Sequence, residues 1–208
     1  MSLGVAALAA PAGAAVGWFA APLTAAYCGP PTRRRRGVLA VLTAATFAVA
    51  GWRFGAHADL AAFLYLGAVG PLLGFVDVRV RRLPDLLTLP SYGIGAALLA
   101  VAVPFADGGG TRFRNAAIGM AVLWFIYAAQ HFVWPDAIGR GDVKLSGVLG
   151  LYLGWLGLDG WVTGALATFF IGGAYALGLI ALRRGSRKSD MPYGPFMLAG
   201  ALLGIIAG

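Results

Sequence analysis

The chain has 208 residues, of which 60% are apolar and 12% are charged, and its mean hydropathy is +0.80. Soluble domains carry roughly 25% charged residues, so this composition excludes an ordinary water-soluble enzyme and favours an integral membrane protein. The net charge of +8 does not indicate a nucleic-acid partner, because basic residues in membrane proteins commonly set orientation. One cysteine and no glutamate exclude an internal disulfide, a cysteine-rich zinc site and a His-Glu-x-x-His zinc-protease motif.

Apolar segments long enough to cross a bilayer recur along the chain and predict an all-α, polytopic membrane bundle of about eight transmembrane helices. We place them at residues 3–22, 38–55, 59–76, 87–105, 116–134, 145–158, 161–182 and 192–207. The first segment lacks a basic start, so we expect a retained span rather than a cleaved signal. No linker is large enough to separate domains, and we expect one integral membrane unit over residues 1–208.

Basic residues are distributed unevenly between alternate loops. If the first span enters from outside, the outer loops hold only Arg53, Arg112 and Arg114. The other Lys and Arg residues, of 16 in total, then face the cytoplasm: Arg33–Arg36, Arg79, Arg81, Arg82, Arg140, Lys144, Arg183, Arg184, Arg187 and Lys188. This asymmetry predicts that both termini lie outside. We expect Arg33–Arg36 to contact anionic membrane lipids and Cys28 to be an inert thiol.

All eight acidic residues are aspartates, and most have a simple explanation. Three fall in short outer loops beside turn residues, where we expect them to be solvated: Asp59, Asp107 and Asp159. Asp190 is expected to be solvated in the last cytoplasmic loop, and Asp136 to cap or solvate the end of the fifth span. Three others remain, at predicted cytoplasmic boundaries: Asp77, Asp85 and Asp142.

Asp77 ends the third span, and Asp142 precedes the sixth at a similar predicted depth. If a packed bundle brings them together, the two carboxylates cannot both ionise easily and will share a proton. One carboxylate can then activate water while the other protonates a carbonyl oxygen, a chemistry that needs no metal and no cofactor. Gly139 and Gly141, which lack side chains, would let a substrate backbone approach Asp142.

The residues alone leave other interpretations open. Gly139–Asp142 could be a tight turn with an aspartate cap and no chemistry. Intramembrane acids also carry protons in transporters, although these aspartates lie at span ends rather than near mid-membrane. A non-catalytic scaffold of a secretion machine is a third class. A serine peptidase using Ser146 with Lys144 is disfavoured, because residues two apart on a helix point to different faces.

Three segments together carry a family resemblance. They are Asp77-x-x-x-Arg81-x-Leu83-Pro84-Asp85-x-Leu87-Thr88-Leu89-Pro90, Gly139-x-Gly141-Asp142-Val143-Lys144-Leu145 and Met191-Pro192-Tyr193-Gly194-Pro195-Phe196. They resemble, in order, the signatures of the type IV prepilin peptidases, which are membrane aspartic peptidases of the Gly-x-Gly-Asp class. The presenilin class shares Gly-x-Gly-Asp but places tyrosine before its first aspartate and carries Pro-Ala-Leu, whereas Val76 stands here and that string is absent.

The resemblance implies that Asp77 and Asp142 are the catalytic pair in a plasma (inner) membrane protein whose active site faces the cytoplasm. It implies that Gly139, Gly141, Asp85 and Lys144 bind substrate or shape the loops, with Asp85 as a turn or helix-cap residue. The implied partner is a pilin-like precursor with a short basic leader, a glycine at the cut and a hydrophobic helix. Many members carry a cysteine-rich methyltransferase insertion between the first two spans. That loop is short here, so we expect cleavage without methylation.

Overall fold

The computed structural model describes residues 2–135, 138–182 and 192–208, and within them the fold is all-α, which confirms the predicted class. The elements in chain order are α1 (Leu3–Ala20), η1 (Ala21–Thr24), α2 (Ala25–Cys28), α3 (Arg33–Phe54), α4 (Leu60–Val80), α5 (Asp85–Ala102), η2 (Val103–Phe105), α6 (Gly109–Val133), α7 (Arg140–Leu156), α8 (Leu158–Ala181) and α9 (Gly194–Ala207). The predictions for Asp136, Asp190, Arg183, Arg184, Arg187 and Lys188 lie outside the described residues.

Each predicted span coincides with a helix. Six helical segments of the described chain are long and apolar enough to cross a membrane. The other two are shorter: α7 has 17 residues and α9 has 14. At 1.5 Å per residue they extend roughly 26 and 21 Å, which is less than a bilayer core of about 30 Å.

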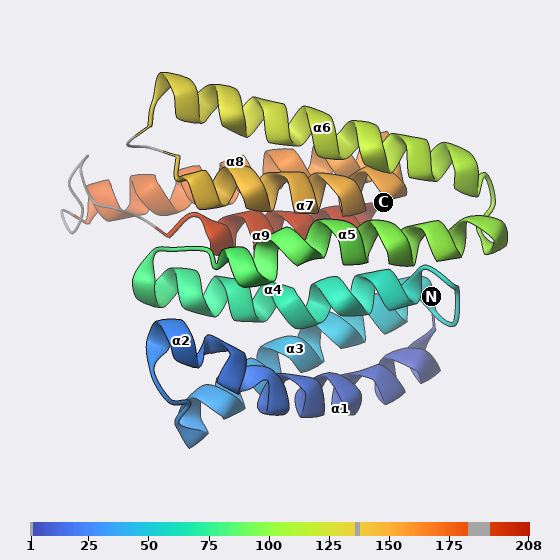
Figure 1. Cartoon of the computed structure of the whole chain (residues 1–208), viewed down its shortest axis with the longest axis horizontal. Helices are drawn as coiled ribbons and strands as arrows, with labels where there is room; N and C mark the ends of the chain where they lie inside the picture. Colours follow the sequence, from blue (N-terminus) through green and yellow to red (C-terminus); the bar gives the residue numbers. More distant parts are fainter. Residues whose placement is uncertain (1, 136–137, 183–191) are drawn as a thin grey trace.

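The helices run roughly side by side, with both termini at one end of the bundle (Figure 1). The end of α4 and the start of α7 lie at the other end. Placing both termini on one side agrees with the arrangement predicted from charge, while the side of the membrane that each end faces stays a prediction.

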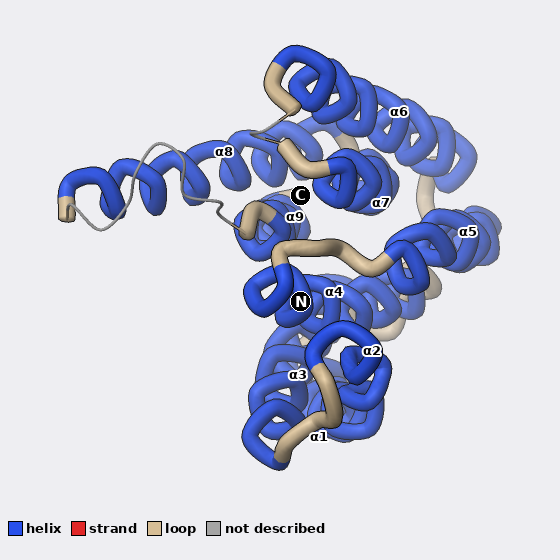
Figure 2. Tube along the Cα trace, turned by 60° about the vertical axis from the view of Figure 1, so that its left-hand side comes forward, coloured by secondary structure: helices blue, strands red, loops and turns tan. Residues whose placement is uncertain are grey.

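α7 lies at the centre of one half of the bundle, with α5, α6, α8 and α9 around it (Figure 2). Leu145 and every residue from Ser146 to Trp155 are buried. A helix that is apolar on all faces is stable only when it is enclosed. Its glycines permit close contact with neighbouring helices: a Cβ added at Gly150 would lie 2.5 Å from the carbonyl oxygen of Gly119 on α6.

Asp59 fastens the end of α7 that lies far from the residues of the predicted site. Its carboxylate is 5% exposed and accepts a hydrogen bond from the Trp155 indole at 3.2 Å. Arg112, at the start of α6, lies 3.7 Å from the same oxygen. The prediction of a solvated loop residue is therefore wrong for Asp59, because it is buried and hydrogen-bonded to Trp155, which is distant in sequence. Asp107 and Asp159 are exposed, as predicted.

Arg35 also departs from its predicted role. Its guanidinium is buried and donates hydrogen bonds to the carbonyls of Gly29 and Cys28 at 2.5 and 2.7 Å. It also lies over the ring of Phe75 on α4, 5.5 Å from the centroid. Arg35 therefore closes the turn between α2 and α3, whereas Arg33 and Arg34 are exposed and remain candidates for headgroup contact.

Gly150→Val is expected to force α6 and α7 apart, because the added Cβ and methyl groups meet the Gly119 carbonyl. Overpacking of this kind typically lowers the free energy of unfolding by about 1–3 kcal/mol. Thermal unfolding in detergent measures the change, and Gly93→Val, at a helical glycine with open space around it, is the matched control. Equal melting temperatures for the two variants would contradict close α6–α7 packing.

Candidate active site

All of the predicted site residues line one polar pocket of about 480 Å³ between the end of α4, the α4–α5 loop and the start of α7. These are Asp77, Asp85, Gly139, Gly141, Asp142 and Lys144. The remaining lining residues are Tyr27, Arg81, Arg82, Leu83, Pro84 and Arg140. The two aspartates, on different helices, therefore open onto the same space.

Asp77 lies in the last turn of α4 and is 5% exposed. The prediction placed it at the end of its span, but the helix continues to Val80. Its Oδ2 atom accepts a hydrogen bond from the backbone N–H of Gly194 at 2.9 Å. A Cβ added at Gly194 would lie 2.8 Å from that oxygen, so this close approach requires glycine.

Gly194 was not among the predicted site residues. The third family-like segment contained it, but no local pattern shows that its N–H meets a carboxylate on α4. The contact forms because α9 begins at Gly194 and its first N–H groups have no intrahelical partner. A carboxylate next to a helix N-terminus satisfies such a donor and is favoured by the helix dipole.

Asp142 lies in the first turn of α7, whereas the prediction placed it in a loop before the helix. Its Oδ2 atom accepts a hydrogen bond from the N–H of Gly139 at 3.0 Å, which caps the helix. The aspartate-cap interpretation is thus correct as geometry. It does not exclude chemistry, because the same carboxylate also lines the pocket that it shares with Asp77.

The surroundings of Asp142 favour its protonated form. Burial raises the pKa of Asp142 above its usual value, and the negative charge of Asp77 raises it further. The hydrogen bond from Gly139 acts in the opposite direction and lowers this pKa. A proton therefore stays on Asp142 at a higher pH than on an isolated aspartate. This is the behaviour expected of two neighbouring carboxylates that share one proton.

Two contacts hold the start of α7 against the segment between α4 and α5. Lys144 Nζ lies 2.7 and 2.8 Å from the two carboxylate oxygens of Asp85. Leu83 packs against Gly141, where an added Cβ would lie 3.0 Å from the leucine Cβ. A side chain at position 141 would therefore require Leu83 or the start of α7 to shift.

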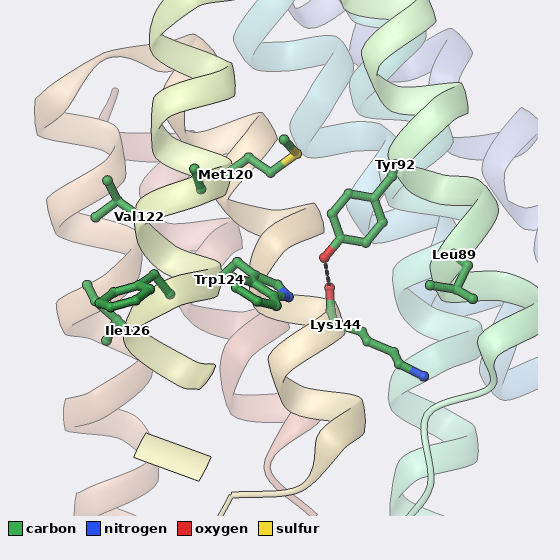
Figure 3. Close-up of a pocket in the computed structure, with 9 residues that line it drawn as sticks. Leu89, Tyr92, Met120, Val122, Trp124, Ile126 and Lys144 are labelled. Atoms are coloured by element: carbon green, nitrogen blue, oxygen red, sulfur yellow. Dashed lines mark hydrogen bonds between the residues drawn. The ribbon is translucent and has the colours of Figure 1, made fainter. Parts of the chain in front are cut away.

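A third contact comes from the body of α5. Tyr92 points from α5 toward α7, and its hydroxyl donates to the backbone carbonyl of Lys144 at 2.6 Å (Figure 3). The Lys144 side chain meanwhile reaches Asp85 at the start of α5. α5 thus holds Lys144 by both its backbone and its side chain, two residues beyond Asp142.

The helix-cap prediction for Asp85 is corrected, whereas the exclusion of Ser146 as a nucleophile is supported. Asp85 is the first residue of α5 and the N-cap position is Pro84, so Asp85 is not the cap. Ser146 is fully buried, and its hydroxyl donates to the Val143 carbonyl at 2.8 Å, which removes it as a nucleophile paired with Lys144. No group of three or more His, Cys, Asp or Glu side chains in the described part of the chain could hold a metal ion.

Residues 62–177 match the type IV leader peptidase family. The chain belongs to this family. A prepilin leader peptidase/N-methyltransferase of Aeromonas hydrophila is 32% identical over 191 residues, which are 90% of this chain and 60% of that protein. A protein of the same name from Klebsiella pneumoniae is 33% identical over 134 residues, 63% of this chain and 57% of that protein.

A third relative with that name, from Burkholderia pseudomallei (strain 1026b), is 31% identical over 199 residues, 90% of this chain and 56% of that protein. The chain therefore spans about half the length of the curated relatives it matches. No solved structure matches the chain. Membership of the family thus rests on sequence.

Asp77→Asn is expected to lower the pKa of Asp142, because the substitution removes the neighbouring negative charge while burial, the larger cause, remains. The carboxyl group should then deprotonate at a lower pH than in the wild type. Infrared difference spectroscopy of the protonated carboxyl band follows this titration, with Asp142→Asn identifying the band. Asp107→Asn, at an exposed site on another loop, should leave the titration unchanged. An unshifted titration in Asp77→Asn would show that the two carboxylates do not interact.

Proposed function

We propose that this protein is a membrane aspartic endopeptidase that removes the short basic leader of type IV pilin-like precursors. The observation that carries the proposal is the pocket onto which Asp77 and Asp142 both open. Family membership supports the reaction class, and the names of the relatives include prepilin leader peptidase. The proposed cut follows a glycine, where a small residue lets an extended backbone come close to the two carboxylates.

In the proposed mechanism the two carboxylates hold one proton between them. The ionised member removes a proton from water, which attacks the peptide carbonyl, while the protonated member donates its proton to the carbonyl oxygen. Each Oδ2 atom is oriented by a backbone N–H, from Gly194 for Asp77 and from Gly139 for Asp142. These hydrogen bonds fix both carboxylates before substrate arrives, so little reorganisation is needed during the reaction.

The proposed location is the inner membrane, with the pocket facing the cytoplasm and both termini outside. The support is charge: Arg81, Arg82, Arg140 and Lys144 line the pocket, and the positive-inside rule places such residues in the cytoplasm. A precursor would keep its leader in the cytoplasm and its hydrophobic helix in the bilayer. The peptide bond to be cut would then lie at the membrane boundary, where water reaches the carboxylates.

We propose that the protein cleaves without methylating the new N-terminus. The support is the short connection between α2 and α3, four residues from Gly29 to Thr32, and the presence of a single cysteine at position 28. Gly139 and Gly141 are proposed to shape the loop beside the substrate. The Asp85–Lys144 ion pair is proposed to orient the start of α7 rather than to take part in the chemistry.

Asp77→Asn and Asp142→Asn are each expected to lower the cleavage rate by at least about 10²–10⁴-fold, because asparagine keeps the shape but cannot transfer the proton. Purified enzyme is reconstituted in liposomes with a panel of pilin-like precursors, and leader removal is followed by mass spectrometry. With S-adenosylmethionine added as methyl donor, the product mass also tests the second proposal, since a methyl group on the new N-terminus would contradict it.

Asp107→Asn is the matched control, since it makes the same substitution at an exposed position outside the pocket. The proposal fails if either pocket variant, shown to be folded by its melting temperature, cuts at the wild-type rate. It also fails if the wild type cuts no precursor in the panel.

Lys144→Met is expected to slow cleavage by about tenfold to a hundredfold through misplacement of α7, with little change in melting temperature. The side chains of Lys144 and Asp85 are 35% and 58% exposed, so the pair itself contributes no more than about 1 kcal/mol. Exchanging the charges, with Asp85→Lys and Lys144→Asp together, should recover part of the rate lost in each single variant. A double variant as slow as the worse single variant would rule out this positioning role.

A further inference from the structure

An apolar groove of about 540 Å³ lies between α3, α4 and α9. These helices lie together in the bundle, with α3 and α9 on the two sides of α4 (Figure 2). On α3 its lining extends from Val38 to Ala50, which at 1.5 Å per residue is about 18 Å. The groove therefore follows more than half of a bilayer core of about 30 Å.

The walls of this groove suit an apolar helix. Three glycines of α4 line it, at positions 67, 70 and 74, and their lack of side chains lets Thr46 of α3 and Leu198 of α9 pack closely on α4. Thr46 supplies the one polar side chain of the lining, and its hydroxyl already donates to the Gly67 carbonyl at 2.8 Å. Pro71 leaves that carbonyl without its usual helical donor, so the threonine satisfies it.

One end of the groove adjoins the proposed catalytic pair. Its lining includes Val78, next to Asp77, and Pro195, next to Gly194. The Gly194 N–H is the group that holds the Asp77 carboxylate. A chain that leaves the groove at this end therefore passes the catalytic pocket within a residue or two.

We infer that this groove binds the hydrophobic helix of the precursor and so places the peptide bond before that helix at the catalytic pair. The inference rests on the proposed peptidase function. A precursor whose apolar helix follows the cut needs an apolar surface that runs along the membrane and ends at the carboxylates. The groove between α3, α4 and α9 has both properties.

Two other grooves of the bundle fit this role less well. One, between α5 and α6, reaches α7 at Lys144 (Figure 3). Lys144 also lines the catalytic pocket, but no residue of this groove is a sequence neighbour of Asp77 or Asp142, whereas Val78 lines the proposed groove. The other, between α6 and α8, ends near Tyr193 but carries polar groups along its length, including Gln130, Trp134 and Tyr127. An apolar helix would leave Gln130 and Trp134 without partners, whereas the Tyr127 hydroxyl is already hydrogen-bonded to Tyr193.

The test fills each groove with a tryptophan and compares two substrates. Ala45→Trp and Ala199→Trp fill the proposed groove from α3 and from α9. Ala121→Trp and Ala165→Trp are the matched controls in the α5–α6 and α6–α8 grooves. The substrates are a full-length pilin-like precursor and a short peptide that ends a few residues after the cut.

The two variants in the proposed groove are expected to lower kcat/KM for the full-length precursor by about tenfold or more. The same two variants should cleave the short peptide, which has no helix to dock, at the wild-type rate. The control variants should cleave both substrates at the wild-type rate. Equal cleavage by all variants, or a loss caused by a control variant instead, would overturn the inference. The groove would then hold lipid only, or another groove would take the helix.

Crosslinking separates this inference from the proposed function, because it needs no cleavage. In a Cys28→Ser, Asp142→Asn background, Ala45→Cys and Ala199→Cys should form disulfides with cysteines placed in the precursor helix. Ala165→Cys and Ala121→Cys should not. If the wild type cuts no precursor, the peptidase proposal fails, while the crosslinks still decide whether an apolar helix enters this groove. If the wild type cuts and no crosslink forms at positions 45 or 199, only the groove assignment fails.

Discussion

The enclosure of α7 is the constraint on which the rest of the structure depends. A helix buried on all sides must be largely apolar along its length, and the side-chain contacts that fix α7 to its neighbours lie near its ends. Asp59 meets Trp155 at one end, and Lys144 meets Asp85 at the other. Because both ends are fastened to neighbouring helices, the first turn of α7 has a defined place, and so does the carboxylate of Asp142.

The pocket is assembled from three segments that are far apart in sequence. Asp77 comes from the last turn of α4, Asp142 from the first turn of α7, and the N–H that holds Asp77 from the first residue of α9. Two of these segments, the first turns of α7 and α9, are helix N-termini, where backbone donors lack intrahelical partners and carboxylates are favourable ligands. The same hydrogen bonds that complete the helices therefore orient the carboxylates, so stability and site geometry depend on shared contacts.

The groove between α3, α4 and α9 extends this relation between fold and site. Pro71 removes one helical hydrogen bond from α4, and Thr46 of α3 compensates for it at the Gly67 carbonyl. Close packing of α3 on α4 at that point leaves an apolar wall with no free polar group. The apolar groove ends where α9 begins, beside Asp77. The apolar surface of the groove therefore adjoins the polar pocket at this position.

The sequence by itself determined the all-α membrane fold, the number of apolar segments and the family, because each depends on run length, composition or a short motif. It also selected the residues that line the pocket. It misplaced Asp142 in a loop, took Asp85 for a turn or helix-cap residue and Asp59 for a solvated residue, and did not identify Gly194. The partners of Asp59 and Gly194 were decided by the tertiary structure alone, because another helix supplies them and the spacing along one segment carries no information about which group a neighbouring helix presents. The errors for Asp142 and Asp85 concern where a helix begins, which a sequence pattern locates only to within a few residues.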